Sequence, residues 1–153
     1  MLIHIDGQVS MQPADWVGFA ARQKQAAMQR MRLRSLELAV VEPTPGALAL
    51  APILSHWIAI ENPQSHGAVL MGSAPDHPIC IGNLIMTSCL CGIAEDGSWA
   101  RTVSRWYRLR APATLEGFLE RNGKKESRMF LQPLKLWQML AITAKEREEL
   151  GVW

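Results

Sequence analysis

Arginine and aromatic side chains are concentrated in residues 98–111, which hold four arginines, two tryptophans and the only tyrosine of the chain. Guanidinium groups form paired hydrogen bonds with phosphate or carboxylate groups, and aromatic rings stack on bases or fill apolar pockets of a partner. The stretch therefore predicts a contact surface. Its candidate binding residues are Trp99, Arg101, Arg105, Trp106, Tyr107 and Arg108.

These residues allow three interpretations, and the sequence leaves all three open. The leading one is a non-enzymatic regulatory protein that binds a partner protein, because Trp, Tyr and Arg are enriched at the energetic centres of interfaces. The second is nucleic-acid binding by the same stretch together with Arg30 and Arg34, which would make affinity fall steeply with salt. The third is structural: arginine stems cover a small core while each charged head pairs with a carboxylate.

Cysteine and histidine side chains suggest a different chemistry. His77, Cys80, Cys89 and Cys91 could supply four zinc ligands. The Cys-x-Cys spacing argues against this, since zinc ribbons usually place Cys-x-x-Cys on a turn. We therefore expect no metal and no other cofactor. An enzyme with a cysteine nucleophile and His77 as base remains the second alternative, although the sequence contains none of the common nucleophile, zinc-protease or phosphate-loop motifs.

Charge and composition limit the class of protein. The chain has 153 residues, with 16 Lys and Arg against 14 Asp and Glu, so its net charge alone would not hold nucleic acid. No apolar run approaches the roughly 20 residues that cross a bilayer, and the N-terminus lacks a signal-peptide pattern. An odd number of cysteines, three, is typical of a reducing compartment. We expect a cytoplasmic protein that does not contact membranes.

The contact residues should lie on a β-hairpin. Two β-rich runs flank Asp96-Gly97, which is a strong hairpin signal. With these two as the loop, Glu95 lies opposite Ser98, and the register further along follows from that pair. The predicted pairs include Cys91 with Thr102, Leu90 with Val103, and Met86 with Tyr107.

Residues 99–110 then form one strand whose two faces both mix apolar and charged side chains. One face would carry Trp99, Arg101, Val103, Arg105, Tyr107 and Leu109. The other would carry Ala100, Thr102, Ser104, Trp106, Arg108 and Arg110. A strand with one buried and one solvated face should separate these types better, so the mixture favours a contact beyond solvent.

The remaining elements predict an α+β protein. A strand is expected in residues 1–7, followed by a long helix over 13–38 whose apolar stripe runs through Trp16, Ala20, Ala27 and Met31. After a break at 43–46, we expect strands at 56–61 and 67–72 and a loop at 74–78. Helices are expected after Pro112 and near Pro133. We expect a single domain, 1–153, in three parts: 1–46, a β-rich centre at 47–112, and 113–153. The sheet would be small and antiparallel or a half-barrel, packed by the long N-terminal helix and the C-terminal helices.

Residues 72–109 resemble an uncharacterised family of small bacterial proteins, found mainly in alphaproteobacteria and their plasmids or phages. The resemblance rests on His77-Pro78, on Thr87-Ser88, and on the Trp-Ala-Arg-Thr-x-Ser-Arg-x-Tyr-Arg-Leu pattern of residues 99–109. It implies no known activity. It does imply a mobile-element setting, where small proteins act on host macromolecules as toxins or as inhibitors of defence systems. A sheet edge or Trp153 could also pair with a second copy of the chain.

Overall fold

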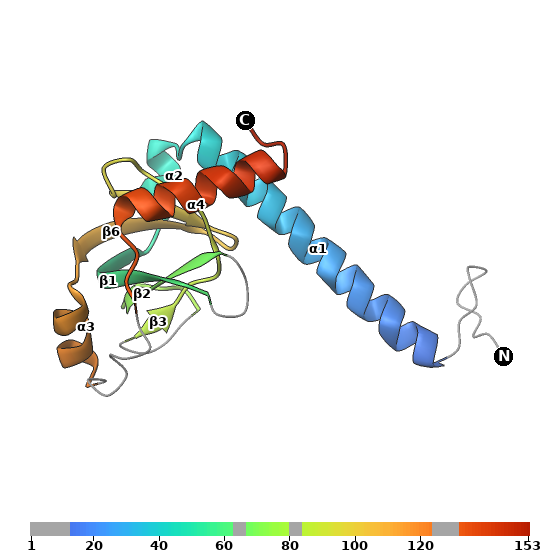
Figure 1. Ribbon diagram of the computed structural model, residues 1–153, viewed down its shortest axis with the longest axis horizontal. Coiled ribbons are helices and arrows are strands. Elements are labelled where there is room, and N and C mark those ends of the chain that lie inside the picture. The colour runs from blue at the N-terminus through green and yellow to red at the C-terminus, as the bar shows by residue number, and fades with distance from the viewer. Residues whose placement is uncertain (1–12, 63–66, 80–83, 124–131) are drawn as a thin grey trace. The chain divides into compact units, whose positions relative to one another are not determined.

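A computed structural model of the protein describes residues 13–62, 67–79, 84–123 and 132–153 (Figure 1). The strand predicted in residues 1–7 lies outside the described residues. Contacts divide the chain into two compact units, residues 1–32 and 33–153. The second unit holds the sheet and every site discussed below. None of the described helices is long and apolar enough to span a membrane.

The predicted long helix is confirmed as α1, Pro13–Val41. Two of the four positions of its predicted apolar stripe are exposed, while Ala27 is half-buried. Ala20 is exposed, Met31 is 53% exposed, and the side chain of Trp16 lies outside the described residues. Burial occurs instead near the end of the helix, where one face packs on the sheet. The buried residues there are Ser35, Leu36 and Ala39.

The chain breaks after α1, as the prolines predict, but a short helix follows at once. This helix, α2 (Pro45–Leu50), is capped by Thr44, whose hydroxyl accepts a hydrogen bond of 3.1 Å from the Ala47 amide. A threonine cap followed by proline in the first turn is a favourable helix start. The sequence analysis assigned only a break here, so it missed a helix that borders the candidate site.

The α+β class is confirmed. One open, six-stranded sheet has the order β3-β2-β1-β6-β5-β4. Its strands are β1 (Ile53–Glu61), β2 (Ala68–Ser73), β3 (Ile85–Met86), β4 (Leu90–Ile93), β5 (Trp99–Thr102) and β6 (Trp106–Pro112). All neighbours are antiparallel except β1 and β6, which are parallel, so the sheet is mixed rather than wholly antiparallel.

Helices α3 (Leu115–Asn122) and α4 (Leu136–Glu149) confirm the predicted C-terminal helices. Helix α4 lies along one face of the sheet (Figure 1), where Met139 packs on the main core. That core contains Leu54, Leu70, Leu90, Ile93, Tyr107 and Leu109. A smaller cluster joins Phe118 and Leu119 of α3 to Ile58 of β1.

The hairpin at Asp96-Gly97 is confirmed, and its register holds near the turn. Ile93 faces Ala100 as predicted. The loop is longer than two residues, however, because the Ala94 amide donates to the Trp99 carbonyl at 2.9 Å and closes it. Gly97 has a φ of 73°, which favours glycine.

Beyond the turn the predicted register is wrong. An irregularity between Leu90 and Gly92 places Leu90 opposite Thr102 instead of Val103, so Cys91 does not face Thr102. Such a bulge adds an unpaired residue to one strand and shifts every later pair. The predicted pair of Met86 with Tyr107 is also wrong. Met86 lies on β3 and faces Met71.

The largest correction concerns residues 99–110, which form two strands and not one. The chain reverses at residues 103–105, where the Thr102 amide donates to the Arg105 carbonyl at 2.9 Å. The Arg105 amide in turn donates to the Thr102 hydroxyl oxygen at 3.3 Å. This turn contains no Gly, Pro, Asn or Asp, and Ser104 is its only common turn residue, so the local turn signal is weak.

The reversal resets the alternation of side chains and removes the mixed polarity that the sequence suggested. On β5 and β6 together, the buried face consists of Ala100, Thr102, Tyr107 and Leu109. The opposite, half-buried face consists of Trp99, Arg101, Trp106 and Arg108. The hairpin therefore separates its residue types as an ordinary half-solvated sheet does.

Candidate functional site

Four of the six predicted binding residues lie together on one face of the β5–β6 hairpin. Trp99 faces Arg108, and Arg101 faces Trp106. The two indole rings meet edge to face, with centroids 5.4 Å apart and planes at 79°. The Arg101 guanidinium lies 5.3 Å from the centroid of the Trp106 ring. Aromatic pairs and cation–π contacts of this kind order the side chains that form them.

Both arginines of this face are held by hydrogen bonds. Arg108 Nε donates to the Ala51 carbonyl at 2.9 Å, which ties β6 to the end of α2. Arg101 donates from a terminal guanidinium nitrogen to the Ser35 hydroxyl at 3.3 Å. That hydroxyl donates to the Val103 carbonyl at 2.7 Å. Arg108 therefore has a structural role, and Arg101 is oriented by the buried Ser35.

Positive charge is not neutralised around Arg101. In the described part of the chain, no carboxylate forms an ion pair with Arg34, Arg101 or Arg105. Burial lowers the pKa of Arg101, the neighbouring Cys91 raises it, and the charges of Arg34 and Arg105 lower it further. Arginine stays protonated even so. The Nε of Arg101 is also buried without a hydrogen-bond partner. The paired heads of the structural interpretation are absent here.

Arg101 and Arg105 border a small cavity of about 230 Å³. Arg101, Arg105 and Trp106 form one side of it, from the hairpin. Its apolar wall comes from α2 and from the segments that flank β1 and follow β2. That wall includes Leu50, which is 89% exposed, together with Pro52 and Pro78. We call this cavity the arginine pocket. It offers guanidinium groups, one indole and an aliphatic surface to the same ligand.

Tyr107 does not belong to this surface, which corrects its assignment as a contact residue. It is 3% exposed and packs in the main core, because the turn at 103–105 places it on the opposite face from Trp106. Its hydroxyl lies 3.0 Å from His77 Nε2. The same imidazole accepts a hydrogen bond from the Ile79 amide through Nδ1, at 3.1 Å. Tyr107 thus positions the loop that carries Pro78.

The hydrogen bond that Nδ1 of His77 accepts fits the neutral form of the ring. Because Nδ1 accepts a hydrogen bond, the proton of the neutral ring resides on Nε2 and points to Tyr107. Desolvation lowers the pKa of His77, and the nearby Arg105 charge adds to the effect, while Asp76 opposes it. Asp76 also fixes the loop, since its carboxylate accepts from the Ile53 amide at 3.2 Å.

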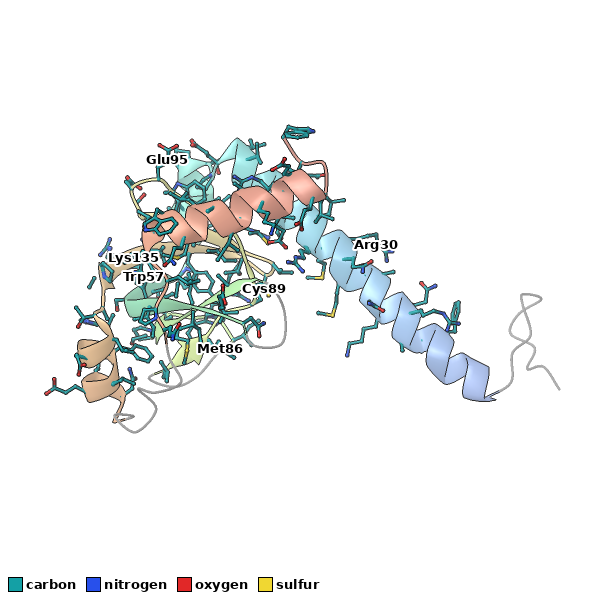
Figure 2. All side chains as sticks on the ribbon, in the orientation of Figure 1. Arg30, Trp57, Met86, Cys89, Glu95 and Lys135 are labelled. Atoms are coloured by element: carbon teal, nitrogen blue, oxygen red, sulfur yellow. The ribbon has the colours of Figure 1, made fainter. Side chains whose placement is uncertain are left out.

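The cysteines that sequence analysis weighed as metal ligands or nucleophiles are distributed as follows. Cys89, which Figure 2 labels, is half-buried, and Cys91 is buried. Cys80 lies outside the described residues. Among the residues that the structure describes, no three His, Cys, Asp or Glu side chains are grouped as metal ligands. The arginine pocket is therefore the better-supported candidate site.

A family model matches residues 23–129 of the chain. The protein belongs to DUF6634, a family of unknown function. This confirms the resemblance to an uncharacterised family that the sequence suggested. The DUF6634 match contains every residue of the arginine pocket and ends before α4. Neither the curated proteins nor the solved structures include a chain that matches this one.

Sequence analysis missed three residues that shape the pocket of this DUF6634 protein: Ser35, Leu50 and Pro78. Ser35 lies within a helix and orients Arg101 across 66 positions of sequence. Leu50 and Pro78 lie in segments that looked only like chain breaks or loops. No local pattern could have identified them, because each contributes through contacts with residues far away in the chain.

Proposed function

We propose that this DUF6634 protein is a non-enzymatic binding protein whose arginine pocket holds an acidic segment of a partner protein. The observation that carries the proposal is the convergence of Arg101 and Arg105 on an apolar-walled cavity, with no carboxylate paired to either among the described residues. A carboxylate of the partner would form charge-assisted hydrogen bonds with both guanidinium groups.

The walls of the pocket favour a protein over a nucleic acid. Leu50 and Pro78 offer aliphatic surface next to the cations, which suits an apolar side chain beside an acidic one. Arg101 is preorganised by Ser35 and Trp106, and preorganised Arg–Trp pairs are typical of interface hot spots. A nucleic-acid backbone would instead be followed by a row of cations.

Nucleic-acid binding is the second candidate, because the same uncompensated guanidinium groups would also suit phosphate. Salt distinguishes the two. Phosphate contacts release counterions, so affinity would fall steeply as salt rises, whereas an interface with a desolvated aromatic centre depends on salt less. In a mobile-element setting, the partner would be a host protein and the activity that of a toxin or an anti-defence inhibitor.

Capture from the native host tests this proposal. Tagged wild-type protein and an Arg105→Gln/Leu50→Ser variant would be used on nuclease-treated and untreated lysate. An Arg121→Gln/Leu33→Ser variant makes the same changes at exposed positions outside the pocket. We expect a protein that survives nuclease, is lost with the pocket variant and is kept by the control. The proposal would be contradicted if the pocket variant still captured that protein, or if the wild type captured nucleic acid alone.

A further inference from the structure

A second hollow lies on the other side of the tryptophan pair. It is a groove of about 770 Å³ between the last turn of α1, strand β4, the β4–β5 loop and α4 with the tail that follows it. Its apolar floor includes Ile93, Leu140 and Val152. Small residues, Ala39, Gly92 and Ala144, also line the groove, and the missing side chain of Gly92 lets α1 pack closely on β4. We call it the acidic groove, for the reason given next.

Acidic residues dominate the charged lining. Four carboxylates, those of Glu42, Glu95, Asp96 and Glu148, face a single guanidinium, that of Arg147. Glu95 is exposed on the loop between β4 and β5 (Figure 2). The Ser98 hydroxyl and amide both donate to the Asp96 carboxylate, at 2.6 and 3.0 Å, and hold its pKa below the usual value. Asp96 is therefore ionised near neutral pH.

Apolar side chains at the same place are exposed to solvent. Trp153 is 87% exposed and Val40 is 39% exposed, and both line the groove. Next to them, Val41 and Leu150 are exposed as well. Apolar groups gathered beside one hollow and rimmed by charge are typical of a protein-contact site. The volume lies in the range of pockets that enclose several groups of a ligand.

We propose that the acidic groove is a second docking surface, which takes a basic segment of a partner protein. Lysine or arginine side chains of that segment would pair with the rim, and an aliphatic or aromatic side chain would cover the floor. Charge complementarity identifies the occupant: a segment without cations would leave four carboxylates facing apolar groups. Opposite potentials across an interface also speed encounter and reject wrong partners.

This site is separate from the arginine pocket, so the inference does not depend on the proposed function above. Trp99 lines the groove and Trp106 lines the pocket. Each site is thus lined by one ring of the edge-to-face tryptophan pair, and the two sites carry charges of opposite sign. A ligand suited to one is repelled by the other.

A designed peptide tests the groove without knowledge of the natural partner. The probe is a fluorescein-labelled peptide with Lys and Leu at helical spacing, and its binding is followed by anisotropy. The groove variant is Glu42→Lys/Glu148→Lys. The matched control, Glu61→Lys/Glu120→Lys, changes the net charge equally at exposed positions outside the groove. We expect the groove variant to weaken binding about tenfold or more and the control to leave Kd within about twofold.

Trp153→Ser provides a variant whose folding is not at risk, because the side chain is almost fully exposed. Trp153→Ser should also weaken binding of the peptide, because it removes an apolar contact that salt does not screen. Equal weakening by the groove pair and its control would show unspecific charge attraction and overturn the proposal. The proposal would also be overturned if light scattering showed a wild-type dimer and the groove variant were monomeric. The occupant of the groove would then be a second copy of the chain.

Discussion

The arginine pocket and the acidic groove differ in charge, although Trp106 of the first and Trp99 of the second are in direct contact. On the Trp106 side, Arg101 and Arg105 have no carboxylate partner in the described residues. On the Trp99 side, four carboxylates line the groove with one arginine. The net charge of +2 conceals this division. A nearly balanced composition can therefore give two surfaces of opposite preference, and only the fold reveals where they lie.

The two regions also differ in how they are built. The pocket is formed by residues 47–106, within the DUF6634 match, and its central cation is fixed by Ser35 and Trp106. The groove is completed by α4 and the tail, which lie beyond the match. Its carboxylates sit on the rim rather than in the interior. We expect the pocket to select ligands by shape and charge, and the groove mainly by charge.

Gly92→Ala should have the largest effect, because it distorts the floor of the groove. An added Cβ at Gly92 would overlap the Ala39 side chain, so the end of α1 must shift away from β4. We expect a loss of about 2 kcal/mol in the free energy of unfolding, as for other overpacked sites. Urea denaturation measures it. The control is Gly46→Ala, where a Cβ meets nothing within 4 Å; a similar loss there would contradict this explanation.

Arg105→Glu reverses a charge in the arginine pocket. It should weaken binding of an acidic ligand at the pocket and leave binding of a basic ligand at the acidic groove unchanged. A labelled peptide of Glu and Leu is the probe for the pocket. Its affinity should fall about tenfold or more, because a like charge replaces a hydrogen-bonding cation. Stability should stay within about 0.5 kcal/mol of the wild type, as for other surface changes. Unchanged affinity for the acidic peptide would show that the pocket does not hold it.

Trp106→Leu tests the wall between the two sites. The change removes the edge-to-face contact with Trp99 and the cation–π contact with Arg101. We expect a stability loss of about 1 kcal/mol. Acidic-peptide binding should weaken too, since Arg101 loses its orientation, while the basic peptide keeps most of its affinity. Equal losses for both peptides would mean that the tryptophan pair supports the whole hairpin rather than the pocket.

A fall in pH should destabilise the loop that carries His77 and Pro78, and we expect this change in the free energy of unfolding to be the smallest effect of the four. His77 has a lowered pKa in the folded protein, so the unfolded chain binds more protons and stability falls as pH drops below about 6.5. Protonation of Nδ1 also removes the acceptor of the Ile79 amide. The His77→Gln variant should lose less stability than the wild type between neutral and mildly acidic pH. A larger loss in that variant would contradict the assignment.

Much of the fold could be predicted from the sequence, because its signals are local. The composition and proline positions of α1 and the Asp96-Gly97 turn gave the long helix and the first hairpin correctly. The turn after Thr102 could not be predicted, since a threonine side chain replaces the usual turn residues there. That one omission reversed the faces of β6 and placed Tyr107 on the wrong side.

The candidate site was predictable in part for the same reason. Arg101, Arg105 and Trp106 stood out by type and spacing, but the residues that orient or enclose them did not. Ser35 and Leu50 act through contacts between distant segments, which no pattern in the sequence encodes. The acidic groove could not be predicted, because its four carboxylates come from three separate places in the chain, Glu42, Glu95-Asp96 and Glu148.

The most direct test of the central claim is one set of titrations with both labelled peptides. Each peptide would be titrated into wild type, into Arg105→Glu and into Glu42→Lys/Glu148→Lys, all checked for the same thermal unfolding. Two sites of opposite charge predict a crossed result: Arg105→Glu loses the acidic peptide alone, and the groove variant loses the basic peptide alone. If either variant weakens both peptides equally, or neither peptide binds, the division of the surface into two docking sites is contradicted.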